Sequence, residues 1–256
     1  AALGWPRASL APKGRATNSD LKKYYPMHVL STARDIINLW VARMVFSSEE
    51  FLGVPPFSDV IIHATILAKS GERMSKSLGT GIDPMDLINK YGADATRFGL
   101  IWQAMGGQDM KWSEEHVLAG KKFANKIWNA ARFVLQNSAR SSTLGVESQK
   151  TPSVFPRAAD KKILAKLAKT QKEVSKLIDK YDFGQALHIL YEFFWHDFCD
   201  IYLEESKKNS NPEVLARVLK ESLKLLQYPL TIQCANSYEK FCLPPPSKCF
   251  YLLQAR

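Results

Sequence analysis

The hydrophobic pattern of the first third of the chain predicts a strand, a helix and a second strand. Residues 24–30 form a short extended run, and apolar residues recur at helical spacing through 33–46. The β-branched centre of 57–67 is too short for a helix and predicts a strand. This order is typical of a βαβ unit in a parallel sheet, which binds ligands at the carboxyl ends of its strands. We therefore expect chemistry just after the second strand.

From about residue 114 the pattern changes to long amphipathic stripes, which predict an antiparallel bundle of helices. The four stripes are marked by these residues: Phe123, Ile127, Ala131 and Val134; Leu164, Leu167, Val174, Leu177 and Ile178; Leu187, Leu190, Tyr191, Phe194, Trp195 and Phe198; Val214, Leu215, Val218, Leu219, Leu223 and Leu226. The predicted fold class is thus α/β plus all-α. The predicted domains are 1–113, 114–226 and an irregular tail at 227–256, and residues 1–18 are expected to be loop.

Composition narrows the class of protein. The chain is 46% apolar and 23% charged, which is ordinary globular composition, and it has no apolar run near the ~20 residues of a membrane span. The four cysteines form no CxxC pair, so we expect reduced thiols and a cytoplasmic location rather than a disulfide or zinc framework. The formal net charge of +10 raises the odds of a polyanionic partner such as nucleic acid, although excess lysine also serves solubility.

Residues 68–84 follow the second predicted strand and are dense in glycine, hydroxyl and cationic side chains. Arg73 and Lys76 supply positive charge, Ser75 and Ser77 supply hydrogen-bond donors, and nearby glycines let the backbone approach a ligand. This composition suits a polyphosphate, although an exposed basic turn has the same composition.

The order of motifs favours the polyphosphate interpretation. Residues 73–77, Arg-Met-Ser-Lys-Ser, resemble the KMSKS signature of class I aminoacyl-tRNA synthetases, with arginine in the first lysine position. Residues 82–88 and 91–98 resemble the block that follows KMSKS in the valine, isoleucine and leucine branch. Residues 35–44 and 107–111, together with aromatic residues of the predicted bundle, resemble the valine-specific members. The resemblance covers roughly residues 20–226.

This resemblance implies the second half of a Rossmann-type catalytic domain with a KMSKS loop, followed by an anticodon-binding bundle. It implies ATP and Mg²⁺ as cofactors, valine as substrate and valine tRNA as partner, with no membrane. By motif position, Lys76 stabilises the pyrophosphate and Arg73 assists it, while Trp40 helps to wall the amino-acid pocket. The implied contacts with ATP come from these residues: Arg73, Met74, Ser75, Lys76, Ser77, His63 and Asp35.

Two departures from the family matter. No His-x-Gly-His motif occurs in the sequence, so we expect a fragment that lacks the N-terminal half and the editing domain and is inactive alone. Ala33 stands where the family usually has glycine, two residues before Asp35.

Three interpretations remain open from sequence. They are part of a valine-specific synthetase, part of an isoleucine- or leucine-type synthetase, and a non-catalytic tRNA-binding module. The lysines of the second stripe form either an ordinary charged face or a track for the tRNA backbone, and we lean slightly to the track: Lys161, Lys162, Lys166, Lys169, Lys172 and Lys176.

Overall fold

The computed structural model describes residues 23–75, 77–104, 108–143, 157–208, 210–228 and 230, with the side chains of 138–143 excepted. Internal contacts divide the chain into two units. The first comprises Ala1–Thr65 with Gly107–Asp109, and the second comprises Ile66–Gly106 with Met110–Arg256. The division therefore falls within the segment 1–113 that the sequence predicts as one domain.

The first unit is a strand–helix–strand arrangement. Strands β1 (Met27–Ala33) and β2 (Phe57–His63) pair in parallel, with Met27 opposite Phe57 and Ala33 opposite His63. They are joined by η2 (Arg34–Ile36), η3 (Ile37–Val41) and α2 (Ala42–Leu52). Gly53 ends α2 with a φ of 67°, a left-handed conformation that glycine adopts without steric cost.

Two short strands open the second unit. β3 (Ile66–Leu67) pairs in parallel with β4 (Met110–Lys111), and between them in sequence lie α3 (Pro84–Tyr91) and α4 (Ala93–Gln103). A small core of Leu87, Ala95, Trp112 and Val117 lies among these elements and the start of the next helix.

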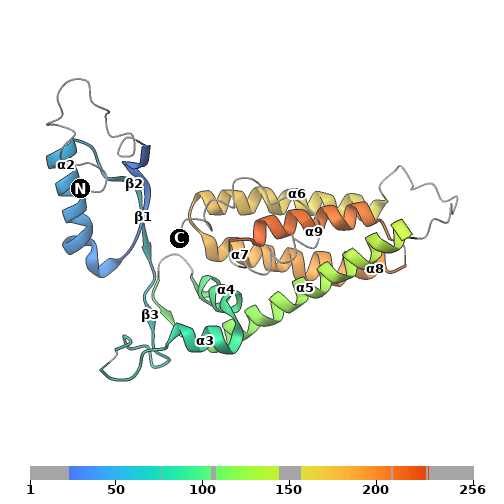
Figure 1. Ribbon diagram of the computed structural model, residues 1–256, viewed down its shortest axis with the longest axis horizontal. Coiled ribbons are helices and arrows are strands. Elements are labelled where there is room, and N and C mark those ends of the chain that lie inside the picture. Colours follow the sequence, from blue (N-terminus) through green and yellow to red (C-terminus); the bar gives the residue numbers. More distant parts are fainter. Residues whose placement is uncertain are drawn as a thin grey trace. The chain divides into compact units, whose positions relative to one another are not determined.

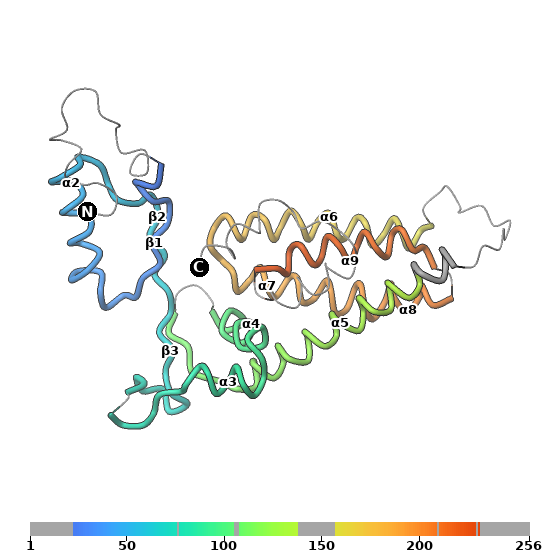
Figure 2. Tube along the Cα trace, in the orientation of Figure 1, coloured from blue at the N-terminus to red at the C-terminus, as the bar shows by residue number. Residues whose placement is uncertain are grey.

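A helical group, α5–α9, makes up the rest of the second unit (Figure 1). It consists of α5 (Glu114–Thr143), α6 (Ala158–Asp179), α7 (Phe183–Glu192), η4 (Phe193–Leu203), α8 (Glu204–Ser206) and α9 (Pro212–Leu226). Figure 2 shows that α7, η4 and α8 form one continuous rod along the chain, and η4 is its π-helical stretch. The helices predicted from the four apolar stripes are therefore present.

One apolar core runs through the helical group. Its fully buried side chains include Phe123 and Ile127 of α5, Phe194 and Phe198 of η4, and Leu219 of α9. The core continues past residue 226, where the sequence predicts the irregular tail to begin. Leu230 is fully buried, and the Tyr228 hydroxyl donates to the Phe183 carbonyl at 3.1 Å. Residues 231–256 of the predicted tail, and the predicted N-terminal loop at 1–18, lie outside the described part.

Glycines let α4 pack closely against two other helices. A Cβ on Gly99 would lie 2.8 Å from the Val117 backbone nitrogen of α5, and one on Gly120 would lie 2.9 Å from the Ala95 carbonyl oxygen of α4. At the start of α7, a Cβ on Gly184 would lie 2.1 Å from the Ala104 carbonyl oxygen just after α4. Backbones meet at these points with no room for a methyl group, so α4 is locked to the helical group.

Candidate functional site

The basic loop after β3 has a defined backbone path at its base. The Ala68 amide donates to the Glu72 carbonyl at 2.8 Å, and Leu67 and Arg73 form an antiparallel bridge. Gly71 makes the turn with a φ of 91°, and a Cβ there would lie 3.2 Å from Cε of Lys111. The base of the loop is therefore a tight hairpin-like turn, which requires a residue that tolerates positive φ.

The tip of the loop is closed by a reciprocal pair of hydrogen bonds between Ser75 and Thr80. The Ser75 amide donates to Oγ1 of Thr80 at 2.9 Å, and the Thr80 amide donates to the Ser75 carbonyl at 3.2 Å. Within the turn the hydroxyls of Ser75 and Ser77 lie 2.8 Å apart, and Gly79 has a φ of 65°. Thr80 was not among the residues predicted to belong to the site. Its position between Gly79 and Gly81 could have pointed to it, because a hydroxyl side chain in a glycine turn can hydrogen-bond to the backbone.

The motif residues divide between the inside and the outside of this loop. The Met74 side chain packs on the small core that includes Leu87 and Trp112, whereas Arg73 and Ser77 are exposed. Lys76, the predicted main contact with pyrophosphate, lies outside the described residues. The loop therefore presents Arg73 and Ser77 to solvent, while Met74 anchors it to the core.

The loop runs directly into the N-terminus of α3, which its sequence caps. The Asp83 side chain accepts from the Met85 amide at 2.8 Å, and Pro84 occupies the first helical position. Farther on, α3 is tied to α5: Lys90 Nζ and the Tyr91 hydroxyl donate to Glu114 Oε1 at 2.8 and 2.7 Å. The hydrogen bond from Lys90 holds the pKa of Glu114 below its usual value, and the same bond raises the pKa of Lys90.

The other predicted site residues belong to the first unit, at the carboxyl ends of its strands. Asp35 follows β1 by two residues and His63 ends β2, and the parallel register places both at one edge of the strand pair. The His63 Nδ1 atom lies 3.1 Å from the Ala64 carbonyl oxygen, and Trp40 in η3 is 59% exposed. This edge is where a parallel sheet binds its ligands.

Two residues that the sequence analysis did not select lie near the same strand ends. Asp109 accepts from the Thr65 amide at 3.1 Å and lies 3.7 Å from the Arg34 guanidinium, so it joins the segments that follow the two strands. Thr32, near the end of β1, is buried, and its hydroxyl has no hydrogen-bond partner in the described part of the chain. Thr32 could not have been selected from the sequence, because threonine is common in strands and nothing near it marks it as unusual.

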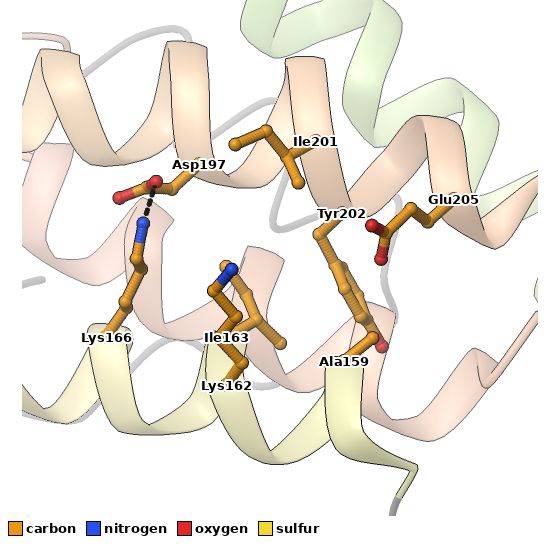
Figure 3. Close-up of a pocket in the computed structure, with 8 residues that line it drawn as sticks. All are labelled: Ala159, Lys162, Ile163, Lys166, Asp197, Ile201, Tyr202 and Glu205. Carbon is orange, nitrogen blue, oxygen red and sulfur yellow. Dashed lines mark hydrogen bonds and ion pairs between the residues drawn. The ribbon is translucent and has the colours of Figure 1, made fainter.

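Two of the six lysines of α6 form ion pairs with acidic residues in the described part of the chain. Lys166 forms an ion pair with Asp197, as Figure 3 shows, and Lys169 Nζ lies 3.9 Å from Glu173 Oε1. Glu205 lines the same shallow hollow as Lys162. Ion pairing therefore balances only part of the positive charge on α6.

The aromatic residues of the third stripe form core contacts. Trp195 is half-buried and stacks on Tyr191 with ring centroids 5.3 Å apart, and Phe193, Phe194 and Phe198 are buried. Among the described residues, no three His, Cys, Asp or Glu side chains gather as a metal site, and no helix has the length and apolarity to cross a membrane.

Comparisons with known proteins agree with this architecture. Residues 3–113 match the family model "tRNA synthetases class I (I, L, M and V)", and residues 160–231 match "Anticodon-binding domain of tRNA ligase". Each of the two segments is therefore similar to one of these families. The second match begins at Asp160, in the first turn of α6, and ends one residue after Leu230.

Curated relatives narrow the assignment to one type of enzyme. Valine–tRNA ligase of Thermotoga maritima is 46% identical over 231 residues, and that of Bacillus subtilis is 43% identical over 234 residues. Each match covers 88% of this chain and 25% of the relative. The chain is thus a relative of valine–tRNA ligase that spans about a quarter of the length of these proteins, which confirms the predicted resemblance.

Solved structures show the fold. Methionyl-tRNA synthetase of Mycobacterium tuberculosis in complex with methionyl-adenylate matches with a TM-score of 0.73 at 19% identity, over 99% of this chain and 50% of that one. LeuRS of Agrobacterium radiobacter K84, from a ternary complex with tRNA and LeuAMS, matches with a TM-score of 0.69 at 18% identity, over 86% of this chain and 28% of that one. At this identity the likeness concerns the fold alone.

Proposed function

We propose that this chain is the part of a valine–tRNA ligase that carries the KMSKS-like loop and the anticodon-binding bundle. The observation that carries the proposal is the match to valine–tRNA ligases, 46% identical across 88% of the chain. The succession of helices around one core supports an antiparallel anticodon-binding bundle, and the polar loop ahead of α3 supports a site for ATP phosphates. We place the protein in the cytoplasm, with valine, ATP and valine tRNA as its partners.

In the proposed reaction a carboxylate oxygen of valine attacks the α-phosphorus of ATP. A P–O bond forms to give valyl-adenylate, and the bond to the departing pyrophosphate breaks. Such an in-line displacement needs positioning and charge stabilisation more than proton transfer. The exposed Arg73 and its sequence neighbour Lys76 are suited to bind pyrophosphate as its charge develops, and the Ser75–Thr80 hydrogen bonds close the loop between residues 75 and 80.

We propose that Asp35, His63 and Trp40 act from the first unit. Asp35 would accept hydrogen bonds from the ribose of ATP, His63 would lie near the nucleotide, and Trp40 would wall the amino-acid pocket. Their support is the position of Asp35 and His63 at the carboxyl edge of the β1–β2 pair. Mg²⁺ accompanies ATP in this chemistry, but the described residues offer no cluster of ligands for it. We therefore assign no step to the ion.

The test is valine-dependent exchange of pyrophosphate into ATP, measured on the protein that carries this chain. Lys76→Ala should reduce the exchange rate tenfold or more, because one charge-assisted contact made in the transition state contributes ~1.5–3 kcal/mol. Lys69→Ala is the matched control, since it removes the same charge from the same loop outside the five-residue motif. Equal rates for Lys76→Ala and the unmodified protein would refute the role of Lys76.

The amino acid used in the exchange assay separates the remaining interpretations. Exchange that responds to valine but not to isoleucine or leucine supports the proposal. Exchange with isoleucine or leucine instead would place the protein in a sister specificity. Binding of tRNA without any exchange, measured on the protein that carries this chain, would identify a non-catalytic tRNA-binding module.

A further inference from the structure

The segment that leads into α5 contacts the chain on both sides of the basic loop. We call residues 68–83 the motif loop, and residues 110–117, which comprise β4 and the first turn of α5, the α5 entry segment. Just before the motif loop, the Leu67 carbonyl accepts from the Trp112 amide at 2.9 Å. Just after the loop comes α3, and Glu114 lies against its C-terminal end. One short stretch of chain therefore holds the residues on either side of the loop.

The carboxylate of Glu114 holds the end of α3 through two charge-assisted hydrogen bonds. Nζ of Lys90 and the hydroxyl of Tyr91 both donate to Glu114 Oε1, at 2.8 and 2.7 Å. The Tyr91 ring also lies under two cations, Lys90 at 4.9 Å and Lys121 of α5 at 5.8 Å from its centroid. In the described part of the chain, Lys90–Glu114 is the one ion pair between α3 and α5. The contact therefore fixes the end of α3 against the start of α5.

The small apolar core connects the same elements to the motif loop. Its buried members include Leu87 of α3 and both Trp112 and Val117 of the α5 entry segment. Met74 and Ile82 pack against this core from the loop. Because close-packed side chains transmit a displacement to their neighbours, a shift of α3 relative to α5 would move the loop.

We propose that Glu114 is a positioning residue for the motif loop, which it holds in place for adenylation through Lys90 and Tyr91 of α3. The proposal rests on the function proposed above. Helix α3 lies between the loop and the start of α5 (Figure 1), and its eight residues span about 12 Å at 1.5 Å per residue. It acts as a short rod that is capped by Asp83 at the loop and held by Glu114 at the other end. An in-line displacement loses rate when the groups that bind the phosphates are misplaced by about an ångström.

The exposure of this contact favours positioning over a purely structural role. The side chain of Lys90 is 63% exposed and that of Glu114 is 36% exposed. Ion pairs this open to water contribute little to the free energy of unfolding, because water competes for both partners. The apolar core keeps α3 folded against α5 without them. Loss of Glu114 should therefore loosen the position of α3 without unfolding the second unit.

The neighbouring Glu115 offers a matched control. It carries the same charge in the same turn of α5, is exposed, and its side chain makes no hydrogen bond or ion pair in the described part of the chain. Glu114→Ala removes both hydrogen bonds together with the charge. Glu114→Gln removes the charge but keeps an oxygen that accepts from Lys90 and Tyr91. Glu115→Ala removes the charge alone.

The first measurement is hydrogen exchange of the motif loop, followed by mass spectrometry on the protein that carries this chain. The Ser75 and Thr80 amides report on the loop, because both are hydrogen-bonded within it. Glu114→Ala should speed exchange of the loop peptides by roughly threefold or more, because local opening becomes easier. Glu114→Gln and Glu115→Ala should stay within about twofold of the unmodified protein. The urea midpoint should be the same for all four proteins.

The second measurement is valine-dependent exchange of pyrophosphate into ATP. Glu114→Ala should raise the KM for pyrophosphate and lower kcat/KM by about tenfold, because the loop no longer holds the phosphates in place. Glu114→Gln should restore most of this loss, and Glu115→Ala should cause none. A merely structural role would instead lower kcat with the fraction of folded protein and leave KM unchanged.

Several results would overturn the proposal and leave the proposed function intact. They are unchanged loop exchange in Glu114→Ala, faster loop exchange with unchanged kinetics, and an equal loss in Glu115→Ala, which would assign the effect to net charge. An equal loss in Glu114→Gln would also overturn it, since the hydrogen bonds would then not matter. If the unmodified protein shows no valine-dependent exchange, the proposed function itself fails, and the role of Glu114 fails with it.

Discussion

A buried carboxylate at the start of α6 offers a sharp test of the helical group. Asp160 has no exposed surface, and it accepts hydrogen bonds from three elements. The Tyr202 hydroxyl of η4 donates at 2.8 Å, the Asn211 amide at the N-cap of α9 donates at 3.0 Å, and the Arg157 guanidinium donates at 3.1 Å. A single carboxylate therefore ties the beginning of α6 to η4 and α9.

The cost of Asp160→Ala follows from what happens to each donor. Tyr202 is 3% exposed, so its hydroxyl would be left buried without an acceptor, which costs about 1–3 kcal/mol. Arg157 and Asn211 are partly exposed and recover most of their hydrogen bonds from water. Loss of the bond from the Arg157 amide to Asp160 also weakens the first turn of α6. The free energy of unfolding should fall by about 2–4 kcal/mol.

Urea unfolding followed by far-ultraviolet circular dichroism measures this loss, because most of the helix lies in the second unit. Tyr202→Phe removes one partner and should cost about 1.5–3 kcal/mol, since the bond it loses is made to a charged group. The double variant Asp160→Ala with Tyr202→Phe should cost less than the sum of the two singles. If Asp160→Ala lies within 0.5 kcal/mol of the unmodified chain, or if the two losses add, the buried network is not as the structure shows.

The same carboxylate predicts how stability depends on pH. Burial alone would raise the pKa of Asp160, but the hydrogen bonds from Arg157, Tyr202 and Asn211 outweigh it and lower the pKa below its usual value. The stabilisation is therefore complete above the unfolded pKa of about 3.9 and is lost as the pH falls through the lower folded pKa. The stability difference between the unmodified chain and Asp160→Asn should shrink as the pH is lowered through this window. A constant difference would contradict the network.

Three further predictions concern separate positions. Gly184→Ala should destabilise the second unit by about 2–4 kcal/mol in the same urea assay, because its Cβ would lie 2.1 Å from the Ala104 carbonyl oxygen. Burial raises the pKa of the Cys199 thiol to about 12, so mass spectrometry should find it unmodified after brief treatment of the folded chain with iodoacetamide at pH 8; rapid labelling would contradict its burial. Thr80→Val should raise proteolytic nicking of the loop by removing the acceptor of the Ser75 amide, whereas Thr80→Ser should not; equal nicking of both variants would show that the hydrogen bond does not hold the turn.

Much of the secondary structure could be predicted from the sequence, because it depends on local periodicity. The apolar stripes from Phe123 to Leu226 predicted helices that the structure contains, and the parallel pairing of β1 with β2 agrees with the predicted strand–helix–strand unit. The exact ends were less certain: β1 covers Met27–Ala33, three residues later than the extended run at 24–30 suggested. Strand ends depend on pairing with the neighbouring strand, which no single segment encodes.

The candidate site was predicted in part. The five-residue motif and its polar loop were visible in the sequence, because glycine, hydroxyl and cationic residues form a recognisable local string. The Thr80 contact that closes the turn, and the packing of Met74 beneath it, depend on how the chain folds back on itself. The roles of Lys76, Asp35, His63 and Trp40 stay predictions.

The sequence by itself determined which segments are helical, where the cations and the motif lie, and which family of enzymes the chain resembles. Tertiary structure decided which of those charges are balanced. Lys166 of α6 pairs with Asp197, 31 residues away along the chain, and Lys126 of α5 pairs with Asp200, 74 residues away. Whether a charge is balanced depends on its distance in space from an opposite charge and not on its position in the sequence. The reason is that salt screens the interaction between exposed charges beyond about 10 Å.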